Sequence, residues 1–369
     1  MKKFYPLIVF LIISLVQLHA ETPDKKPIRL AIAGTTHGHT AFILGRKDKT
    51  DFQIVGIFES NSECVQGLAK KYKFEPGLIY SNLVQMLDEV KPEAVVAFGS
   101  IFEHMAVVEA CAPRGIHVMV EKPLSTNRIH AKRMAELAEK HQIHILTDFE
   151  TSWYPTTAKS FQLVNDSNFI GSIRKVVIHD GHQGPKEIGC DQFFLDWLTD
   201  PIQNGGGALI DFGCYGANLM TYLQKGQEPL SVTAVTRNFK PKIYPKVDDE
   251  ATIIVTYPES QCIIQASWNW PFGRKDMEIY GDSGYIIAND NKTMHLRNRT
   301  MNAEQTKRVT SNDIAVYEDP FSYFADVITG KRVMTKYDPY SLNNNVQVVK
   351  ILVAARESAQ TGKTVQFKK

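Results

Sequence analysis

The sequence predicts a two-domain chain: an α/β domain, followed by an α+β domain. From residue 28 to 149, short apolar runs alternate with helical patterns, which is typical of a doubly wound parallel sheet. Beyond residue 149, period-two segments follow one another without intervening helices, which is typical of an open, largely antiparallel sheet with one covered face. The chain of 369 residues also fits two domains, which we place at 21–149 and 150–369.

The first twenty residues have the pattern of a secretory signal peptide. Lys2 and Lys3 precede an apolar run over 7–16, and Ala20 offers a small residue before a polar stretch. The run is shorter than the roughly 20 apolar residues that a membrane-spanning helix needs. We therefore expect residues 1–20 to be cleaved and the protein to be exported, to the periplasm or outside the cell. An uncleaved N-terminal anchor is the alternative.

Charge and cysteine content exclude several classes of protein. The formal net charge of +2 falls to about zero once Lys2 and Lys3 are removed, so the chain has no basic field for nucleic acid. We expect no nucleic-acid partner and no stable membrane insertion after cleavage. An odd number of cysteines without CxxC spacing argues against a metal cluster or a complete disulfide framework. A single disulfide after export is the alternative. The cysteines are Cys64, Cys111, Cys190, Cys214 and Cys262.

The first domain should contain five strands, at residues 28–33, 52–58, 94–98, 117–120 and 143–146. Between the last two, Ser125 or Thr126 is expected to cap a helix. The apolar face of that helix should hold Ile129, Met134, Leu137 and Ala138.

The second domain should contain strands at residues 173–179, 231–235, 251–257, 262–268 and 277–280. Helical patterns cover residues 208–223 and 342–358, and the last helix is expected to pack back on the first domain. We expect the chain to form a homo-oligomer through the C-terminal sheet.

Two separated segments supply a lysine, an aspartate and a tyrosine. Glu121-Lys122-Pro123 closes a predicted strand, and the glycine-rich segment over 205–215 carries Asp211 and Tyr215 at the start of a helix. Sites on α/β folds lie at such element ends. An ammonium beside a phenol favours the phenolate and lowers the phenol pKa from about 10 towards neutrality. The segments therefore predict the acid–base groups of a carbinol dehydrogenase.

These segments resemble the Gfo/Idh/MocA oxidoreductases, the family of glucose–fructose oxidoreductase and inositol dehydrogenase. The resemblance runs from about Ile28 to the C-terminus and also includes the strand and turn over 28–34 and the ending over 357–363. It implies a Rossmann domain over 21–149 that binds NAD(P) and a substrate and oligomerisation domain over 150–369. Many members have histidine at the position of Tyr215, so this chain is similar to the branch with tyrosine.

The first strand-to-helix turn is the expected pyrophosphate site, but it departs from the G-x-G-x-x-G pattern. Of that pattern only Gly34 is in place, because Thr36 and His39 replace the second and third glycines. The turn still lies between a strand and a helix, and Gly38 supplies part of the missing freedom. The expected cofactor contacts here are Gly34, Thr35, Thr36, His37 and Gly38.

Glu59 ends the second strand, where an acid accepts hydrogen bonds from the adenosine ribose and repels a 2′-phosphate. The expected cofactor is therefore NAD, while Ser60 and Asn61 keep NADP open, and a solvated strand-end acid is the alternative role for Glu59. His37, His39 and His104 are not accompanied by a convergent carboxylate or cysteine in the sequence, so no metal is expected. A core or capping role is the alternative for His104. The resemblance adds the cofactor contacts Phe98, Ser100, His104, Glu121 and Lys122.

The resemblance also implies roles in catalysis. Lys122 would lie by the nicotinamide and the reacting hydroxyl, Tyr215 would exchange the hydroxyl proton, and Asp211 would orient Lys122 or a sugar hydroxyl. A buried core aromatic is the alternative for Tyr215.

Aromatic residues with polar neighbours, typical of carbohydrate sites, predict a sugar, polyol or glycoside substrate. Two other functions stay open: a glycosidase that uses transient oxidation and elimination with NAD, and a sensor that binds dinucleotide without catalysis. The expected substrate contacts are Trp153, Tyr154, His182, Asp191, Asp211 and Tyr215.

Overall fold

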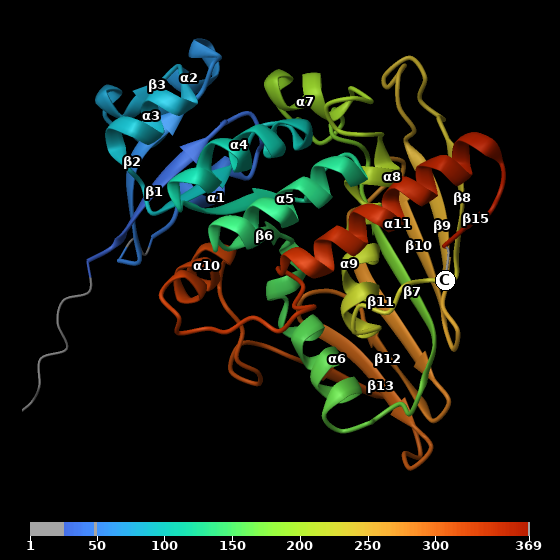
Figure 1. Cartoon of the computed structure of the whole chain (residues 1–369). Coiled ribbons are helices and arrows are strands. Elements are labelled where there is room, and N and C mark those ends of the chain that lie inside the picture. Colours follow the sequence, from blue (N-terminus) through green and yellow to red (C-terminus); the bar gives the residue numbers. More distant parts are fainter. Residues whose placement is uncertain (1–25, 48–49, 368–369) are drawn as a thin grey trace, which may run out of the picture.

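A computed structural model describes residues 26–47 and 50–367 (Figure 1). The predicted signal peptide lies outside these residues. Within them, every helix is too short or too polar to cross a membrane. The described chain is built on two sheets, as the sequence predicts.

The first sheet has six parallel strands in the order β3-β2-β1-β4-β5-β6, which confirms the doubly wound α/β fold. The short β3 was not predicted, because two residues carry no periodicity. The last strand begins two residues later than predicted. The strands are β1 (Ile28–Ala33), β2 (Phe52–Phe58), β3 (Ile79–Tyr80), β4 (Ala94–Ala97), β5 (His117–Glu121) and β6 (Ile145–Asp148).

Helices α1 (Thr40–Leu44), α2 (Ser62–Tyr72), α3 (Leu83–Val90), α4 (His104–Cys111) and α5 (Arg128–His141) connect these strands. The predicted cap of α5 is wrong: the side chain of Asn127 accepts the backbone N–H of His130. The prediction that Ile129 is buried is also wrong, since it is 79% exposed. Ile129 precedes Met134 by five residues, more than a full turn, so the two side chains point in different directions.

The second sheet has nine strands in the order β14-β13-β12-β11-β7-β10-β9-β8-β15. Neighbours are antiparallel except β10 and β7, which pair in parallel, so the mixed, mostly antiparallel sheet confirms the predicted fold class. Strands β12 to β15 were not predicted from the sequence. The strands are β7 (Ile173–Gly181), β8 (Ser231–Arg237), β9 (Glu250–Thr256), β10 (Gln261–Ser267), β11 (Arg274–Gly281), β12 (Gly284–Ala288), β13 (Thr293–Asn298), β14 (Gln305–Arg308) and β15 (Val365–Gln366).

Two short helices, α8 (Ala208–Asp211) and α9 (Gly213–Leu223), replace the single helix predicted over 208–223, and Phe212 separates them. Helix α9 lies close on β10, because a Cβ on Gly216 would be only 2.7 Å from the side chain of Ile264. The remaining helices are α6 (Pro155–Asn165), α7 (Gln192–Leu198), α10 (Pro320–Ile328) and α11 (Leu342–Thr361).

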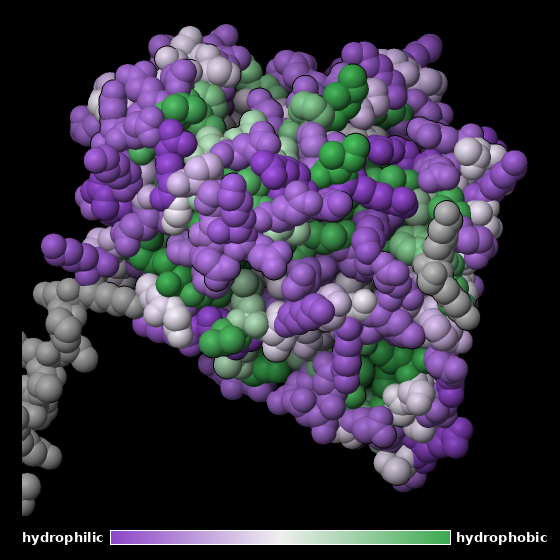
Figure 2. All heavy atoms as spheres, viewed as in Figure 1, coloured by the Kyte–Doolittle hydropathy of each residue, from purple (hydrophilic) through white to green (hydrophobic). Residues whose placement is uncertain are grey.

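Helix α11 joins the two halves of the molecule, as the sequence predicts. It packs against α5 and β6 on one side and against α9 and β8 on the other (Figure 1). Helix α10 also returns to the first sheet, where Phe321 and Phe324 share a core cluster with Leu30 and Ile32. The face shown in Figure 2 is mostly hydrophilic, with apolar residues in separate patches.

All five cysteines are unpaired, and four of them are buried. Cys190 is half-buried.

Candidate active site

Two cavities follow the carboxyl edge of the first sheet. The first, of about 550 Å³, is here called the Lys122 cavity; His37, Gly38, His39 and Tyr215 line it together with Lys122. The second, of about 620 Å³, is called the Glu59 cavity. Its lining includes Gly34, Thr36, Glu59, Ser100 and His104. The structure therefore divides most of the predicted cofactor residues between these two cavities, while Thr35, Phe98 and Glu121 line neither of them.

Gly34 places the first turn against the end of β4. Its φ is +79°, and a Cβ on it would lie 2.6 Å from the backbone nitrogen of Gly99. Its own N–H donates to the carbonyl oxygen of Phe58 over 2.8 Å. The turn thus requires glycine both for its backbone conformation and for this close approach.

Gly34→Ala is expected to destabilise the protein by about 1–3 kcal/mol, because alanine at positive φ is strained and the added methyl overlaps backbone. Urea unfolding would measure this change. Gly38→Ala is the matched control, since a Cβ there meets nothing within 4 Å. Equal stability of the two variants would contradict this account of the turn.

Glu59 holds the same turn from the side of β2. Its Oε2 accepts the backbone N–H of Thr35 over 2.7 Å and the Thr35 hydroxyl over 2.9 Å. Its Oε1 accepts the N–H of Asn61 over 2.9 Å, and the residue is 6% exposed. Glu59 is therefore a buried acid with fixed oxygens rather than a solvated strand-end acid, and it faces the Glu59 cavity.

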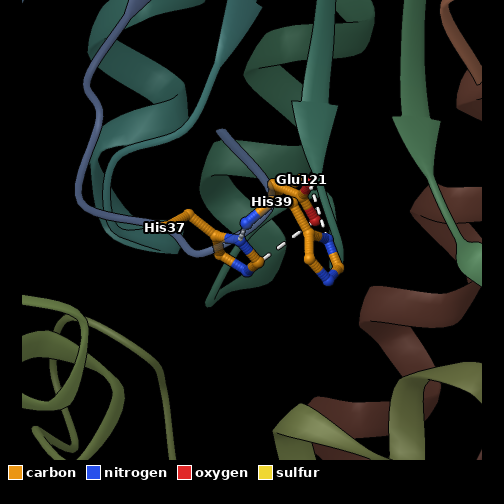
Figure 3. A group of neighbouring side chains, drawn as sticks. All are labelled: His37, His39 and Glu121. Carbon is orange, nitrogen blue, oxygen red and sulfur yellow. Dashed lines mark hydrogen bonds and ion pairs between the residues drawn. The ribbon is translucent and has the colours of Figure 1, made fainter. Parts of the chain in front are cut away.

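His37 and His39 converge on Glu121 at the end of β5 (Figure 3). The Nδ1 atom of His39 lies 3.0 Å from Glu121 Oε1, and Nε2 of His37 lies 3.8 Å from Glu121 Oε2. The expectation that no metal binds assumed that these histidines have no carboxylate partner, and the contacts with Glu121 show that this premise is wrong.

The protonation of His37 shows what this group of three does. Burial lowers the pKa of His37 to about 3, so the ring is neutral. Its Nδ1 accepts the backbone N–H of His39 over 3.0 Å, which leaves the ring proton on Nε2, on the side of Glu121. His39 in turn helps to lower the pKa of Glu121 against the effect of burial. The contacts among these three side chains hold the turn after β1 beside the end of β5.

The segment after β4 contributes main chain and one buried histidine. Ser100 donates from its N–H and hydroxyl to Glu103, and the Phe98 ring packs towards Phe321 in the core. Phe98 therefore offers the turn only its carbonyl oxygen, which accepts the N–H of His37. His104 is fully buried, and burial lowers its pKa to about 4. Among the described residues, its Nε2 has no partner.

Lys122 and Asp211 form a buried ion pair between the two domains. Lys122 Nζ lies 2.5 Å from Asp211 Oδ1, and each side chain is 7% exposed. Asp211 Oδ2 accepts the indole N–H of Trp268 over 2.9 Å. Burial opposes both charges, but the attraction between them is stronger. The pKa of Lys122 is therefore raised by Asp211, and the pKa of Asp211 is lowered by Lys122. Asp211 therefore accepts the hydrogen bond of Lys122, and its expected role of orienting Lys122 or a sugar hydroxyl stays a prediction.

Tyr215 lies in the first turn of α9 and is 1% exposed. Lys122 Nζ is 5.4 Å from the centre of its ring, and the hydrogen bonds of this lysine among the described residues go to Asp211. Burial, with Glu150 next in importance, raises the pKa of Tyr215 well above its usual value. The prediction that the pKa falls towards neutrality is therefore wrong for the described chain.

Most of the predicted substrate residues line the Lys122 cavity: Tyr154, His182, Asp191, Asp211 and Tyr215. Trp153 does not, and lines a separate hollow of about 330 Å³ beside α6. Four further residues of the lining were not predicted: Arg274 and Lys275 at the start of β11, and the apolar side chains Ile188 and Phe194. The two cations lie three and four residues after the aromatic segment over 268–271, which is part of the chain between β10 and β11, and this segment was the available signal.

A parallel sheet with a dinucleotide-type turn, closed by a second, mixed sheet, defines a two-domain protein of the Rossmann type. Residues 28–149 match the family model for the NAD-binding Rossmann fold of the Gfo/Idh/MocA oxidoreductases, and residues 162–287 match a C-terminal domain model of the same family. These matches cover more than half of the chain. The chain belongs to the Gfo/Idh/MocA family of NAD-binding oxidoreductases.

One curated relative is trans-1,2-dihydrobenzene-1,2-diol dehydrogenase of Sus scrofa, which is 22% identical over 226 residues, 61% of this chain. The match spans only 63% of the length of the pig enzyme. The enzyme of the same name from Xenopus laevis is 28% identical over 64% of this chain and 67% of its own length.

Solved structures show the same fold over nearly the whole chain. Aldose-aldose oxidoreductase from Caulobacter crescentus, complexed with glycerol, has a TM-score of 0.75 at 18% identity and covers 92% of this chain and 100% of its own. An inositol dehydrogenase homologue from Azotobacter vinelandii, complexed with NAD+, has a TM-score of 0.77 at 15% identity, with 94% and 98% covered.

Proposed function

We propose that the protein transfers hydride between a nicotinamide cofactor and a carbinol of a sugar, polyol or glycoside. The observation that carries this proposal is the Lys122–Asp211 ion pair, which shares one cavity with Tyr215 and with His37 of the first turn. A cation held at a fixed point beside a phenol is the arrangement that proton exchange with a hydroxyl needs.

The residues around the two cavities fit a dinucleotide. Gly34 brings the turn close to β4, and two buried polar atoms, His104 Nε2 and Glu121 Oε2, have no hydrogen-bond partner among the described residues. Gly34, Thr36, Glu59 and His104 would hold the adenosine and pyrophosphate side, and Lys122 the nicotinamide side. When bound, the oxidised nicotinamide accepts the hydride of the carbinol.

The residues of the chain divide the remaining work. Lys122 donates a hydrogen bond to the reacting oxygen, and Asp211 with Trp268 keeps its ammonium in place. Tyr215 exchanges the proton of that oxygen. When a carbonyl is reduced, the neutral phenol of Tyr215 can donate its proton to the carbonyl oxygen, because the pKa of Tyr215 lies above its usual value.

The relatives support the substrate class. Their names refer to a diol, to aldoses and to inositol, all of which carry carbinols. The Lys122 cavity combines apolar side chains such as Phe194 and Ile188 with Asp191, His182 and Lys122, the mixture that a sugar ring or a glycoside requires.

Purification of the full-length protein tests the proposal. Mass spectrometry would identify NAD or NADP retained by the protein, and nicotinamide absorbance would be followed on addition of sugars, polyols and aryl glycosides. A substrate-dependent absorbance change with an intact glycosidic bond is the expected result. Release of the aglycone would instead identify a glycosidase, and bound cofactor without turnover would identify a sensor.

Glu59→Gln is expected to raise the affinity for NADP relative to NAD by about tenfold, which corresponds to about 1.4 kcal/mol. Glutamine retains an acceptor for Thr35 but removes the charge that would repel a 2′-phosphate. Titration of both cofactors would measure the ratio, and Glu63→Gln, an exposed acid four residues further on, is the control. An unchanged ratio would remove Glu59 from the ribose site.

A further inference from the structure

The hydroxyl of Tyr215 faces a second lysine, on β11 of the mixed sheet. Lys275 Nζ lies 3.5 Å from the Tyr215 hydroxyl and 4.7 Å from the centre of its ring. Lys122 is further from the ring, and its hydrogen bonds go to the Asp211 carboxylate and, over 3.2 Å, to the Asp211 carbonyl. Lys275 is therefore the lysine that donates to the phenol oxygen.

Lys275 is fixed in this position by Glu150, in the turn after β6. The two side chains form an ion pair through Glu150 Oε2, while Glu150 Oε1 accepts the hydroxyl of Tyr154 over 2.6 Å. The lysine and glutamate side chains are 23% and 30% exposed, so the pair is mostly shielded from solvent. A long, flexible side chain is thereby held at one point beside the phenol.

Apart from Lys122, the other titratable groups around Tyr215 oppose a negative charge on it. The charged or titratable groups facing it come from five elements besides β11: Glu150 in the turn after β6, Asp180 on β7, Asp211 on α8, Cys214 on α9, and Lys122 after β5. Three of these are carboxyl groups, and Asp180 is 1% exposed, with Oδ1 lacking a partner among the described residues. Lys122 is paired with Asp211, as Lys275 is with Glu150, and of these two lysines Lys275 is the one with a hydrogen bond to the Tyr215 hydroxyl. A cation directed at the hydroxyl is therefore what a phenolate at this place requires.

We propose that Lys275, anchored by Glu150, is the positioning residue that holds the Tyr215 hydroxyl and stabilises its phenolate in the carbinol oxidation proposed above, on which this inference rests. Oxidation requires the fraction of Tyr215 that has lost its proton to solvent, and this fraction rises with pH. The phenolate oxygen then takes the proton of the substrate hydroxyl, while the carbinol C–H bond breaks, its hydride with two electrons passes to the oxidised nicotinamide, and the C=O bond forms. In reduction the same proton returns from Tyr215 to the carbonyl oxygen.

The pH dependence of kcat/KM for oxidation separates this role from a structural one. Lys275→Met is expected to lower kcat about 10²-fold at neutral pH and to move the rising limb of the profile upward by about one pH unit or more, because the phenolate loses its cation. Lys275→Arg keeps the charge and should restore the limb towards its original position. Glu150→Gln keeps an oxygen that can accept the hydrogen bond of Lys275 but removes a negative charge near Tyr215, so it should move the limb in the opposite direction, to lower pH.

Two further measurements complete the test. NAD affinity, measured by direct titration, should be unchanged in Lys275→Met, and Lys350→Met, which removes an exposed lysine paired with Glu228, is the control for loss of a lysine. If Lys275→Met does not fold, the pH profiles of Lys275→Arg and Glu150→Gln still show whether charge at these two positions sets the rising limb of kcat/KM.

Two contrary outcomes would distinguish a failure of the role of Lys275 from a failure of the proposed function. A wild-type profile and rate in Lys275→Met, or equal losses in the Met and Arg variants, would overturn the role of Lys275 while leaving the proposed function intact. Absence of turnover in the wild-type protein with every carbinol would overturn the proposed function, and the role of Lys275 with it.

Discussion

Tyr215→Phe is expected to lower turnover about 10²- to 10⁴-fold, the usual contribution of a general acid–base group, without loss of the fold or of NAD binding. The ring would keep its packing, including the perpendicular contact with Phe149 at 5.5 Å between ring centres. Only the hydroxyl is removed, and the hydroxyl contacts Lys275. Steady-state kinetics, thermal unfolding and cofactor titration measure the three quantities.

The rest of the cavity supplies the control for this prediction. Tyr154→Phe removes another hydroxyl in the same cavity, one that donates to Glu150, and should cost much less turnover than Tyr215→Phe. Near-normal turnover in Tyr215→Phe would make Tyr215 a core aromatic, and the proton would then have to pass through Lys122, His182 or water.

Lys122→Met is expected to abolish most activity and also to destabilise the protein by about 3–5 kcal/mol, the range found when one partner of a buried ion pair is removed. Asp211 would remain buried with the indole N–H of Trp268 as its side-chain partner. Urea unfolding would measure the stability and steady-state kinetics the activity.

The double variant Lys122→Met/Asp211→Asn separates the two effects. Removing both charges should recover a large part of the lost stability, because no unpaired buried charge is left, but it should recover no activity. Equal instability of the single and double variants would show that Lys122 contributes packing rather than charge pairing. Combined with Tyr215→Phe, Lys122→Met should lose little more activity than the worse single variant, since residues that act as a unit are not additive.

The sequence was sufficient for features that repeat along the chain or lie within one short segment. Periodicity located five of the six strands of the first sheet and five strands of the second, because a buried face imposes its spacing on local sequence. The landmarks around Lys122, Asp211 and Tyr215 were legible for the same reason: each lies in one segment at the end of an element. Elements too short to show a periodicity, such as the two-residue β3, and helix caps such as Asn127 could not be predicted in this way.

The tertiary structure decided which of these groups meet. Glu121 reaches His37 and His39 because β5 ends beside the turn after β1, and Lys275 reaches Tyr215 because β11 pairs with β7 beneath α9. Trp153, predicted at the substrate site, instead faces the hollow beside α6. Sequence periodicity records which face of an element is buried, but not which distant charge lies opposite it. That depends on strand order and register, and in this protein it gives Tyr215 the cation from β11 and leaves Lys122 paired with Asp211.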